Sequence, residues 1–301
     1  MSIPLEPELY GLSEDEAVFF KSQTGIEGDE ELKNHILTVQ AEAYKASLGP
    51  HQGSGRLNHR PPFSQIRPYP CIRIFSFLRL GISKHPSYQR FLAIGRECEG
   101  AIYVEIGCCF GNDARKAVAD GYPVHQIIAT DLHSEFWSLG HKLFKSTSDS
   151  FPARFITTDI LHLKDSSENS TYTTISEVQS LTQLRGSVSA IHAAAFFHLF
   201  DEEQQLQIGK IMAMLLSSTP GSMIFGTHIG LPTKGHREAP ITRAGRTRSM
   251  FCHSPESWRS MWDGVIFPKG TVDVEVSLKE VDLPDISGAK FCIFVWCITV
   301  Q

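Results

Sequence analysis

A series of short apolar runs after Gly100 constrains the fold more than any other feature of the sequence. Five of these runs are separated by stretches long enough for helices, and strands that alternate with helices form a parallel sheet. The last two runs are separated only by a short segment with Pro284 and Gly288, so we expect them to pair antiparallel. The pattern predicts an α/β, Rossmann-like fold. Its predicted strands are 102–106, 126–130, 154–157, 189–195, 222–227, 272–278 and 290–300.

The first hundred residues predict helices instead. Ser13 and Glu16 have the spacing of a capping box, in which each side chain binds the other residue's backbone amide. Apolar residues at positions 32, 36, 39 and 43 predict an amphipathic helix over about residues 30–46. Pro70 and Pro86 are expected to open two further helices, over 71–80 and through about residue 97.

Two segments lack such periodicity. Residues 48–65 are rich in Gly, Pro, His and Asn and predict a loop, and residues 166–182 form a polar insertion between two strands. We therefore expect two parts, a helical N-terminal region (1–98) and an α/β domain (99–301).

Composition narrows the class of protein. The chain has 301 residues, 42% of them hydrophobic and 20% charged, which is typical of a globular enzyme with one catalytic domain and an appendage. A net charge of -5 does not attract nucleic acid, so the expected partner is a small molecule. The N-terminus has no signal-peptide pattern and no run of 18 apolar residues occurs, so we expect a cytoplasmic protein that does not bind membranes. A homodimer is compatible with these features.

The seven cysteines and the thirteen histidines do not form a recognisable metal motif. No C-x-x-C pair is present, which argues against a zinc site and against a disulfide framework. The sequence therefore predicts that the protein works without a metal.

The turn after the first predicted strand is the candidate ligand site. Parallel sheets bind ligands beyond the carboxyl ends of their strands, and Gly107 and Gly111 would let backbone approach a nucleotide there. Asp131 ends the second strand, where a carboxylate can bind both hydroxyls of a ribose, and Asp159 follows the third strand, where it can bind an adenine amine. Glu105 lies within the first strand and can orient the glycine turn or a ligand amino group. Each residue alone also fits a structural role, but their order along three successive strands favours a nucleoside site.

A nicotinamide enzyme is the nearest alternative with this fold. Its fingerprint is G-x-G-x-x-G, whereas the turn here has Cys109 in place of the middle glycine. A pyrophosphate needs close backbone approach, so the turn favours a ligand that has no phosphate.

Several motifs together resemble one known family. They are Tyr69-Pro70-Cys71-Ile72-Arg73, the segment from Glu105 to Asp113, Gly121-Tyr122-Pro123, the segment from Phe196 to Phe200, and the segment from His253 to Trp258. The chain resembles fungal class I methyltransferases of meroterpenoid and polyketide pathways, especially the carboxyl methyltransferases of austinol-type pathways. The resemblance implies a seven-stranded methyltransferase sheet under an N-terminal helical lid, with S-adenosylmethionine as cofactor and a carboxylic acid of a meroterpenoid or polyketide-derived intermediate as substrate.

The sequence and the resemblance together predict the residues of the site. A carboxylic acid is already ionised at neutral pH, so catalysis would consist of orientation and exclusion of water, with donors for the carboxylate. The basic segment after the fifth strand supplies such donors at positions 234, 236, 237, 243, 246 and 248, although a solvated loop explains it equally well. The predicted cofactor residues are Tyr69, Glu105, Gly107, Cys108, Gly111, Asp113, Asp131, Leu132, Asp159, Ile160 and Phe196. The predicted catalytic residues are His198, His228 and Arg73, and the predicted substrate contacts are Arg246, Arg248, His253 and Trp258.

Three other functions remain open from the sequence. His198 or His228 could act as the base for a hydroxyl substrate, because the histidine pKa lies close to neutral pH. A protein with this fold could also catalyse cyclisation or isomerisation, or serve as a non-catalytic subunit. A pocket for a prenylated substrate could be lined by Phe196, Phe197, Trp258 and Trp262, which could also be ordinary core residues.

Overall fold

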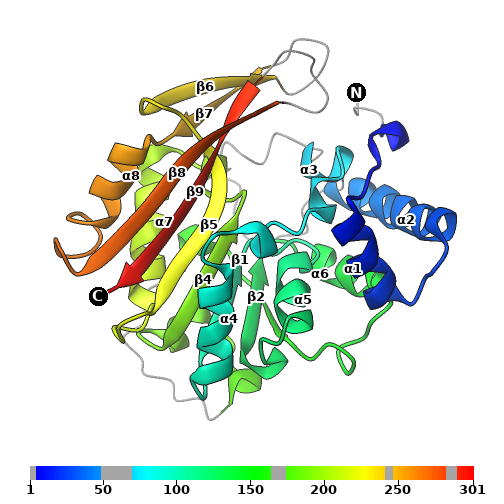
Figure 1. Cartoon of the computed structure of the whole chain (residues 1–301), viewed down its shortest axis with the longest axis horizontal. Coiled ribbons are helices and arrows are strands. Elements are labelled where there is room, and N and C mark those ends of the chain that lie inside the picture. The colour runs from blue at the N-terminus through cyan, green and yellow to red at the C-terminus, as the bar shows by residue number, and fades with distance from the viewer. Residues whose placement is uncertain (1–4, 49–69, 164–173, 241–246, 283–289) are drawn as a thin grey trace, which may run out of the picture.

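A seven-stranded mixed sheet forms the centre of the molecule (Figure 1). The computed structural model describes residues 5–48, 70–163, 174–240, 247–282 and 290–301. The strand order is β3-β2-β1-β4-β5-β9-β8, with β1 to β5 parallel and β9 antiparallel to both neighbours. This is the class I methyltransferase arrangement, and it confirms the predicted fold. The strands are β1 (Ile102–Ile106), β2 (Ile127–Asp131), β3 (Arg154–Thr157), β4 (Val188–Ala194), β5 (Met223–Gly230), β8 (Val272–Asp282) and β9 (Lys290–Val300).

Helices cover both faces of the sheet, as a parallel sheet requires. Tyr103 of β1 packs in one core with α4 (Tyr88–Glu97), α5 (Asn112–Ala119) and α6 (Ser134–Leu143). Its neighbour Val104 packs in a second core with α7 (Glu202–Leu215) and α8 (Pro255–Trp262). No helix of the described residues is long and apolar enough to cross a membrane. Short 3-10 helices span Pro7–Leu9, Ser76–Leu78, Ile82–Lys84, Val124–Gln126, Ile160–His162, Ile175–Glu177, Leu181–Leu184 and Phe197–Leu199.

The first two predicted helices are confirmed as α1 (Glu14–Thr24) and α2 (Asp29–Leu48). The capping box is present, because Ser13 N donates to Glu16 Oε2 over 2.9 Å and Glu16 N donates to Ser13 Oγ over 3.4 Å. The apolar face of α2 lies in a third core, which it shares with α1 and α6. The residues of that face are Leu32, Ile36, Val39 and Ala43, each at most 1% exposed.

The prediction of one helix over 71–80 is wrong. The helix α3 (Pro70–Arg73) ends after one turn, and Phe75 adopts a left-handed backbone with φ of 58°. The Phe75 ring is fully buried and packs edge-on against Tyr10, so tertiary packing holds this conformation although it is costly for a residue with a Cβ. The predicted loop 48–65 lies outside the described residues apart from its first position.

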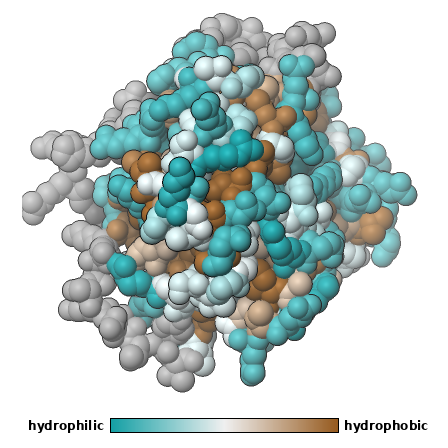
Figure 2. All heavy atoms as spheres, turned by 60° about the vertical axis from the view of Figure 1, so that its left-hand side comes forward, coloured by the Kyte–Doolittle hydropathy of each residue, from teal (hydrophilic) through white to brown (hydrophobic). Residues whose placement is uncertain are grey.

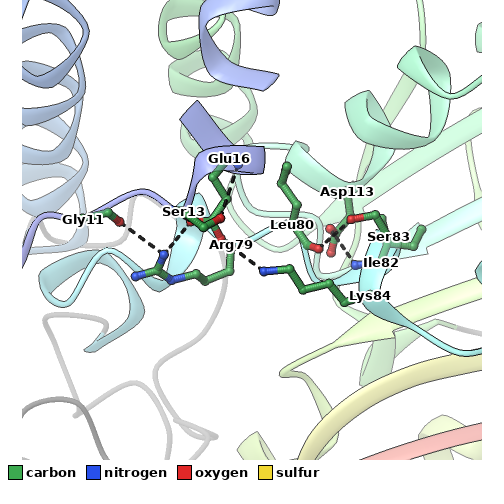
Figure 3. Close-up of polar contacts among 9 residues, drawn as sticks. All are labelled: Gly11, Ser13, Glu16, Arg79, Leu80, Ile82, Ser83, Lys84 and Asp113. Atoms are coloured by element: carbon green, nitrogen blue, oxygen red, sulfur yellow. Dashed lines mark hydrogen bonds and ion pairs between the residues drawn. The ribbon is translucent and has the colours of Figure 1, made fainter. Parts of the chain in front are cut away.

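The N-terminal helices rest against the turn that follows β1. Phe77 packs edge-on against Phe110 of that turn, with ring centroids 4.8 Å apart. The Gln40 amide donates to the carbonyl of Ile72 over 2.9 Å and so joins α2 to α3. Ile82 N also donates to Asp113 Oδ1 over 3.1 Å (Figure 3). The helical region is therefore attached directly to the candidate site.

Glu16 is a buried carboxylate that connects α1 to the segment before α4 (Figure 3). Its side chain is 1% exposed and lies 2.6 Å from the Arg79 guanidinium and 3.8 Å from Lys84 Nζ. Both cations are about half exposed, so solvent screens much of this attraction. The main stabilising role of Glu16 is therefore to accept the partly buried hydrogen bonds from Ser13 and Arg79.

Glu16→Ala should lower the free energy of unfolding by about 2–3 kcal/mol, because it removes the capping box and leaves the Ser13 amide without its acceptor. Urea denaturation followed by circular dichroism measures the change. Glu14→Ala is the matched control, since Glu14 is exposed on the same helix. Equal losses in the two variants would contradict this role of Glu16.

The basic segment after β5 is a hairpin rather than the predicted loop. Strands β6 (Gly235–Pro240) and β7 (Thr247–Cys252) pair antiparallel in a separate two-stranded sheet. Neither strand alternates apolar with polar residues, because β6 reads Gly-His-Arg-Glu-Ala-Pro and β7 ends in three consecutive apolar residues, Met250, Phe251 and Cys252. The usual strand signal is therefore missing. The left-hand side of Figure 1, which comes forward in Figure 2, shows separate hydrophobic areas between hydrophilic ones.

Candidate functional site

The glycine turn connects β1 to α5 at the carboxyl edge of the sheet. The amides of Gly107 and Cys108 both donate to the carbonyl of Thr130 on β2, over 2.8 and 3.0 Å. Gly111 N then donates to the Cys108 carbonyl over 2.7 Å and closes the turn. Backbone bonds therefore hold the start of the turn to the neighbouring strand.

Both predicted glycines are required by the backbone. Gly107 and Gly111 have φ of 72°, in the left-handed region that favours glycine. A Cβ at Gly107 would lie 2.6 Å from the Phe196 ring, and one at Gly111 would lie 2.6 Å from the Trp137 ring. The turn thus combines unusual dihedral angles with close approach of aromatic rings from two other elements.

Asp131 joins the glycine turn to the end of β2. Its Oδ2 accepts from Cys109 N over 2.9 Å and its Oδ1 accepts from His133 N over 3.0 Å. Burial raises the pKa of this carboxyl, while the backbone donors favour the charged form. A carboxylate has about four acceptor positions, so both oxygens retain capacity for ligand hydroxyls. The adjacent Leu132 is 51% exposed, which provides an apolar surface next to these acceptors.

Asp159 follows β3 at the same edge. It caps a 3-10 helix by accepting from Leu161 N over 3.1 Å, and it pairs with His162 Nδ1 over 2.8 Å. The carboxyl is partly exposed at a cavity of about 680 Å³, whereas Ile160 beside it is buried. The structure therefore places the predicted acidic residues of β2 and β3 at one edge, each within a local network of hydrogen bonds.

Glu105 and Asp113 form a buried carboxyl pair behind the turn. One atom of each, and one ring nitrogen of His192, lie within 4.8 Å of one another. Burial raises the pKa of Glu105 well above its usual value and that of Asp113 to about 7. Asp113 accepts a backbone bond from Ile82, so we assign the charge to Asp113 and the proton to Glu105. Such a buried pair supports the turn from behind. That the protein works without a metal remains a prediction from the sequence.

The other residues predicted from the sequence lie at different places. Arg73 is buried and pairs with Glu6 over 2.7 Å, within the N-terminal region. Cys108 is buried in the turn, and Phe196 and His198 are partly buried in the segment after β4. Tyr69 and Arg246 lie outside the described residues, and Arg248 is in β7.

A buried aromatic cluster surrounds His228 at the carboxyl end of β5. Phe197, Trp258, Trp262 and Trp296 are each at most 1% exposed and pack on one another around the imidazole. Trp296 Nε1 donates to His228 Nδ1 over 2.8 Å. Trp258, predicted as a substrate contact, is fully buried here, with its ring centroid 4.9 Å from that of His228.

His253 lies on the outer side of this cluster. Its Nδ1 bonds with Ser257 Oγ over 2.9 Å, and its ring packs against Trp258. It also lines a cavity of about 510 Å³ beside α7 and α8, together with Lys234 and Met261. His253 therefore combines a structural bond with access to a pocket.

Comparison with known proteins agrees with this architecture. Residues 5–78 match a family model described as the meroterpenoid methyltransferase N-terminal domain. The chain is 32% identical over 218 residues to O-methyltransferase phiE of Fungal sp. (strain ATCC 74256), covering 72% of this chain and 66% of that protein. It is 34% identical over 204 residues to asnovolin E/chermesin D methyltransferase nvfJ of Aspergillus novofumigatus, covering 68% and 66%. The chain therefore resembles fungal methyltransferases over most of its own length.

The chain is also similar to methyltransferase ausD of Aspergillus calidoustus, with 28% identity over 200 residues, covering 66% of this chain and 65% of that protein. The chain spans slightly less than two thirds of the length of each of these three relatives.

Sequence reasoning missed several residues that shape the candidate site. Thr130 supplies the carbonyl that holds the glycine turn, Trp137 covers Gly111, and Trp296 binds His228. Thr130 had a usable signal, because it lies at the end of a predicted strand next to Asp131. Trp137 and Trp296 had none, since their partners are 26 and 68 positions away in the chain.

Proposed function

We propose that the protein transfers a methyl group from S-adenosylmethionine to the carboxylate of a small hydrophobic acid in fungal secondary metabolism. The observation that carries the proposal is the arrangement at the carboxyl edge, where the glycine turn, Asp131 and Asp159 follow three adjacent strands. The three relatives named above are all methyltransferases, which supports methyl transfer as the reaction.

The residues present fit S-adenosylmethionine. The Gly107–Gly111 turn offers backbone without a phosphate-binding glycine pattern, and Asp131 has acceptor capacity for the two ribose hydroxyls. Leu132 offers an exposed apolar surface for the adenine, and Asp159 lies one strand further for its amine. Phe196 covers Gly107 and would border the methionine part.

Methylation of a carboxylate does not require the protein to remove a proton from the acceptor. S-adenosylmethionine when bound supplies a methyl group on a positively charged sulfur, which is already activated for displacement. The acid is ionised at neutral pH, so the protein must orient its oxygen and exclude water. The buried aromatic cluster around His228 provides a dry environment for that purpose.

We also propose that residues 1–98 form a cover over the site. Phe77 contacts Phe110 of the glycine turn, and Ile82 N binds Asp113 of α5. Arg246 and Arg248, which the sequence predicts as substrate contacts, remain proposed donors to the substrate carboxylate.

Asp131→Ala should raise the dissociation constant for S-adenosylmethionine by about 10-fold to 100-fold, since it removes hydrogen bonds to a charged acceptor. Isothermal titration calorimetry measures the binding, and mass spectrometry detects the methyl ester. The dissociation constant of Asp131→Asn should lie between those of the wild type and Asp131→Ala, because the amide keeps one acceptor oxygen. Asp149→Asn, at an exposed position, is the control.

Two results would contradict the proposal. Folded wild-type protein that does not bind millimolar S-adenosylmethionine would remove the cofactor assignment. Binding that is unaffected in Asp131→Ala would show that the cofactor lies elsewhere.

A further inference from the structure

One ring nitrogen of His228 has a hydrogen-bond partner, and the other has none among the described residues. Trp296 Nε1 can only donate, and it lies 2.8 Å from His228 Nδ1, so Nδ1 must be the acceptor. In a neutral imidazole the proton then resides on Nε2. His228 Nε2 is buried and has no hydrogen-bond partner among the described residues.

The imidazole is neutral for two reasons. Burial among aromatic rings lowers the pKa of His228 well below its usual value. Positive charge on His198 or His253, the titratable groups that face it, would lower the pKa of His228 further. A neutral ring whose Nδ1 is occupied can donate through Nε2 but cannot accept a proton there.

The position of His228 points to a ligand for that donor. Its ring lies 5.6 Å from that of Phe197, and the preceding Phe196 covers Gly107 of the cofactor turn. Two consecutive residues therefore bridge the cofactor turn and His228. A buried N–H without a partner costs about 1–3 kcal/mol, and native proteins seldom leave such a group unexplained.

We propose that Trp296 is a positioning residue that locks His228 as an Nε2–H donor for the acceptor oxygen of the substrate. The inference rests on the proposed function and narrows it. An imidazole that can donate a hydrogen bond but has no free nitrogen to take up a proton suits an acceptor oxygen that is already ionised, such as a carboxylate. It does not suit an alcohol, whose proton would have to be removed. The hydroxyl alternative with His228 as base is thereby disfavoured.

The first test reads the tautomer directly. Long-range ¹H–¹⁵N NMR spectra of histidine-labelled protein distinguish a protonated ring nitrogen from a bare one, and His228→Gln identifies the signal. We expect Nδ1 bare and Nε2 protonated between about pH 6 and 8, given the usual histidine pKa of about 6.5. Trp296→Phe keeps a ring but removes the donor, so it should yield a mixture of tautomers. Protonated Nδ1 in the wild type, or an imidazolium ion at pH 7, would overturn the proposal.

The second test compares variants in turnover. The probes are farnesoic acid and farnesol, a prenyl acid and the alcohol of the same skeleton. Gln places an amide N–H close to the position of Nε2, so His228→Gln should retain methyl ester formation within about 10-fold. His228→Leu should lose about 10-fold to 150-fold, the value of one hydrogen bond to a charged group. Loss to the same extent in both variants, or methylation of farnesol in preference to the acid, would contradict a donor role.

The two readouts separate this inference from the proposed function. The tautomer seen by NMR does not depend on turnover. It shows whether Trp296 fixes the proton of His228 on Nε2, even if neither probe is methylated. Unchanged S-adenosylmethionine binding in both His228 variants should accompany any loss of turnover. Absence of cofactor binding in the wild type would instead defeat the proposed function, and with it the substrate role of His228, whatever tautomer the NMR spectra show.

Discussion

Gly107→Ala is expected to reduce S-adenosylmethionine binding by about 30-fold to 1,000-fold and to abolish detectable methyl transfer. The left-handed backbone at this position costs an alanine about 1–2 kcal/mol. Its methyl group would also lie 2.6 Å from the Phe196 ring, which has to shift. The turn can relieve this strain only by moving away from the geometry that the cofactor needs. A loss of about 2–4 kcal/mol of binding free energy corresponds to the stated range, at about 1.4 kcal/mol for each tenfold change. Calorimetric titration with the cofactor measures it.

Gly100→Ala is the matched control for this prediction. Gly100 has a φ of 75°, nearly the same as Gly107, but a Cβ there would meet no atom within 4 Å. Gly100→Ala should therefore lose about 1–2 kcal/mol of stability and keep its affinity for the cofactor. Normal binding by Gly107→Ala would show that the turn does not contact the cofactor closely.

Trp258→Ala should lower the free energy of unfolding by about 3–5 kcal/mol, which is a large share of the stability of an ordinary domain. Trp258 is fully buried, and its ring lies within 5.7 Å of those of Phe197, Trp262 and Trp296. Removal of the indole leaves a cavity that rigid neighbours cannot fill. Urea denaturation at constant temperature measures the loss.

Trp258→Phe should cost much less, about 1 kcal/mol. It retains an aromatic ring and removes an indole N–H that is buried without a hydrogen-bond partner among the described residues. Val265→Ala, at a position 58% exposed, should change stability by less than about 0.5 kcal/mol. If Trp258→Ala were as stable as Val265→Ala, the cluster would not be part of the structural core.

Elements with strong local signals were predicted correctly. The capping box at Ser13 begins α1, and the apolar spacing from Leu32 to Ala43 defines α2. The apolar runs became strands of the single seven-stranded sheet, with boundaries shifted by a few residues. Hydrophobic periodicity is a local property of the chain, so it can be read without knowledge of distant contacts.

The errors arose where distant contacts override local preference. Pro70 and the residues after it favour a helix, yet the chain turns at Phe75 because burial of its ring against Tyr10 favours the left-handed backbone. The β6–β7 hairpin was missed because charged side chains on a separate sheet do not show the apolar alternation of a core strand.

The sequence by itself determined the order of the strands along the chain, the glycine turn and the acidic residues that follow β2 and β3. Chain order and parallel pairing suffice to place those residues at one edge of the sheet. Only the tertiary structure decided which rings cover the glycines, that Glu105 and Asp113 share a buried site, and that Trp296 faces His228. These pairs lie far apart in sequence or on different elements, and their contacts depend on packing of whole side chains, which local patterns do not encode.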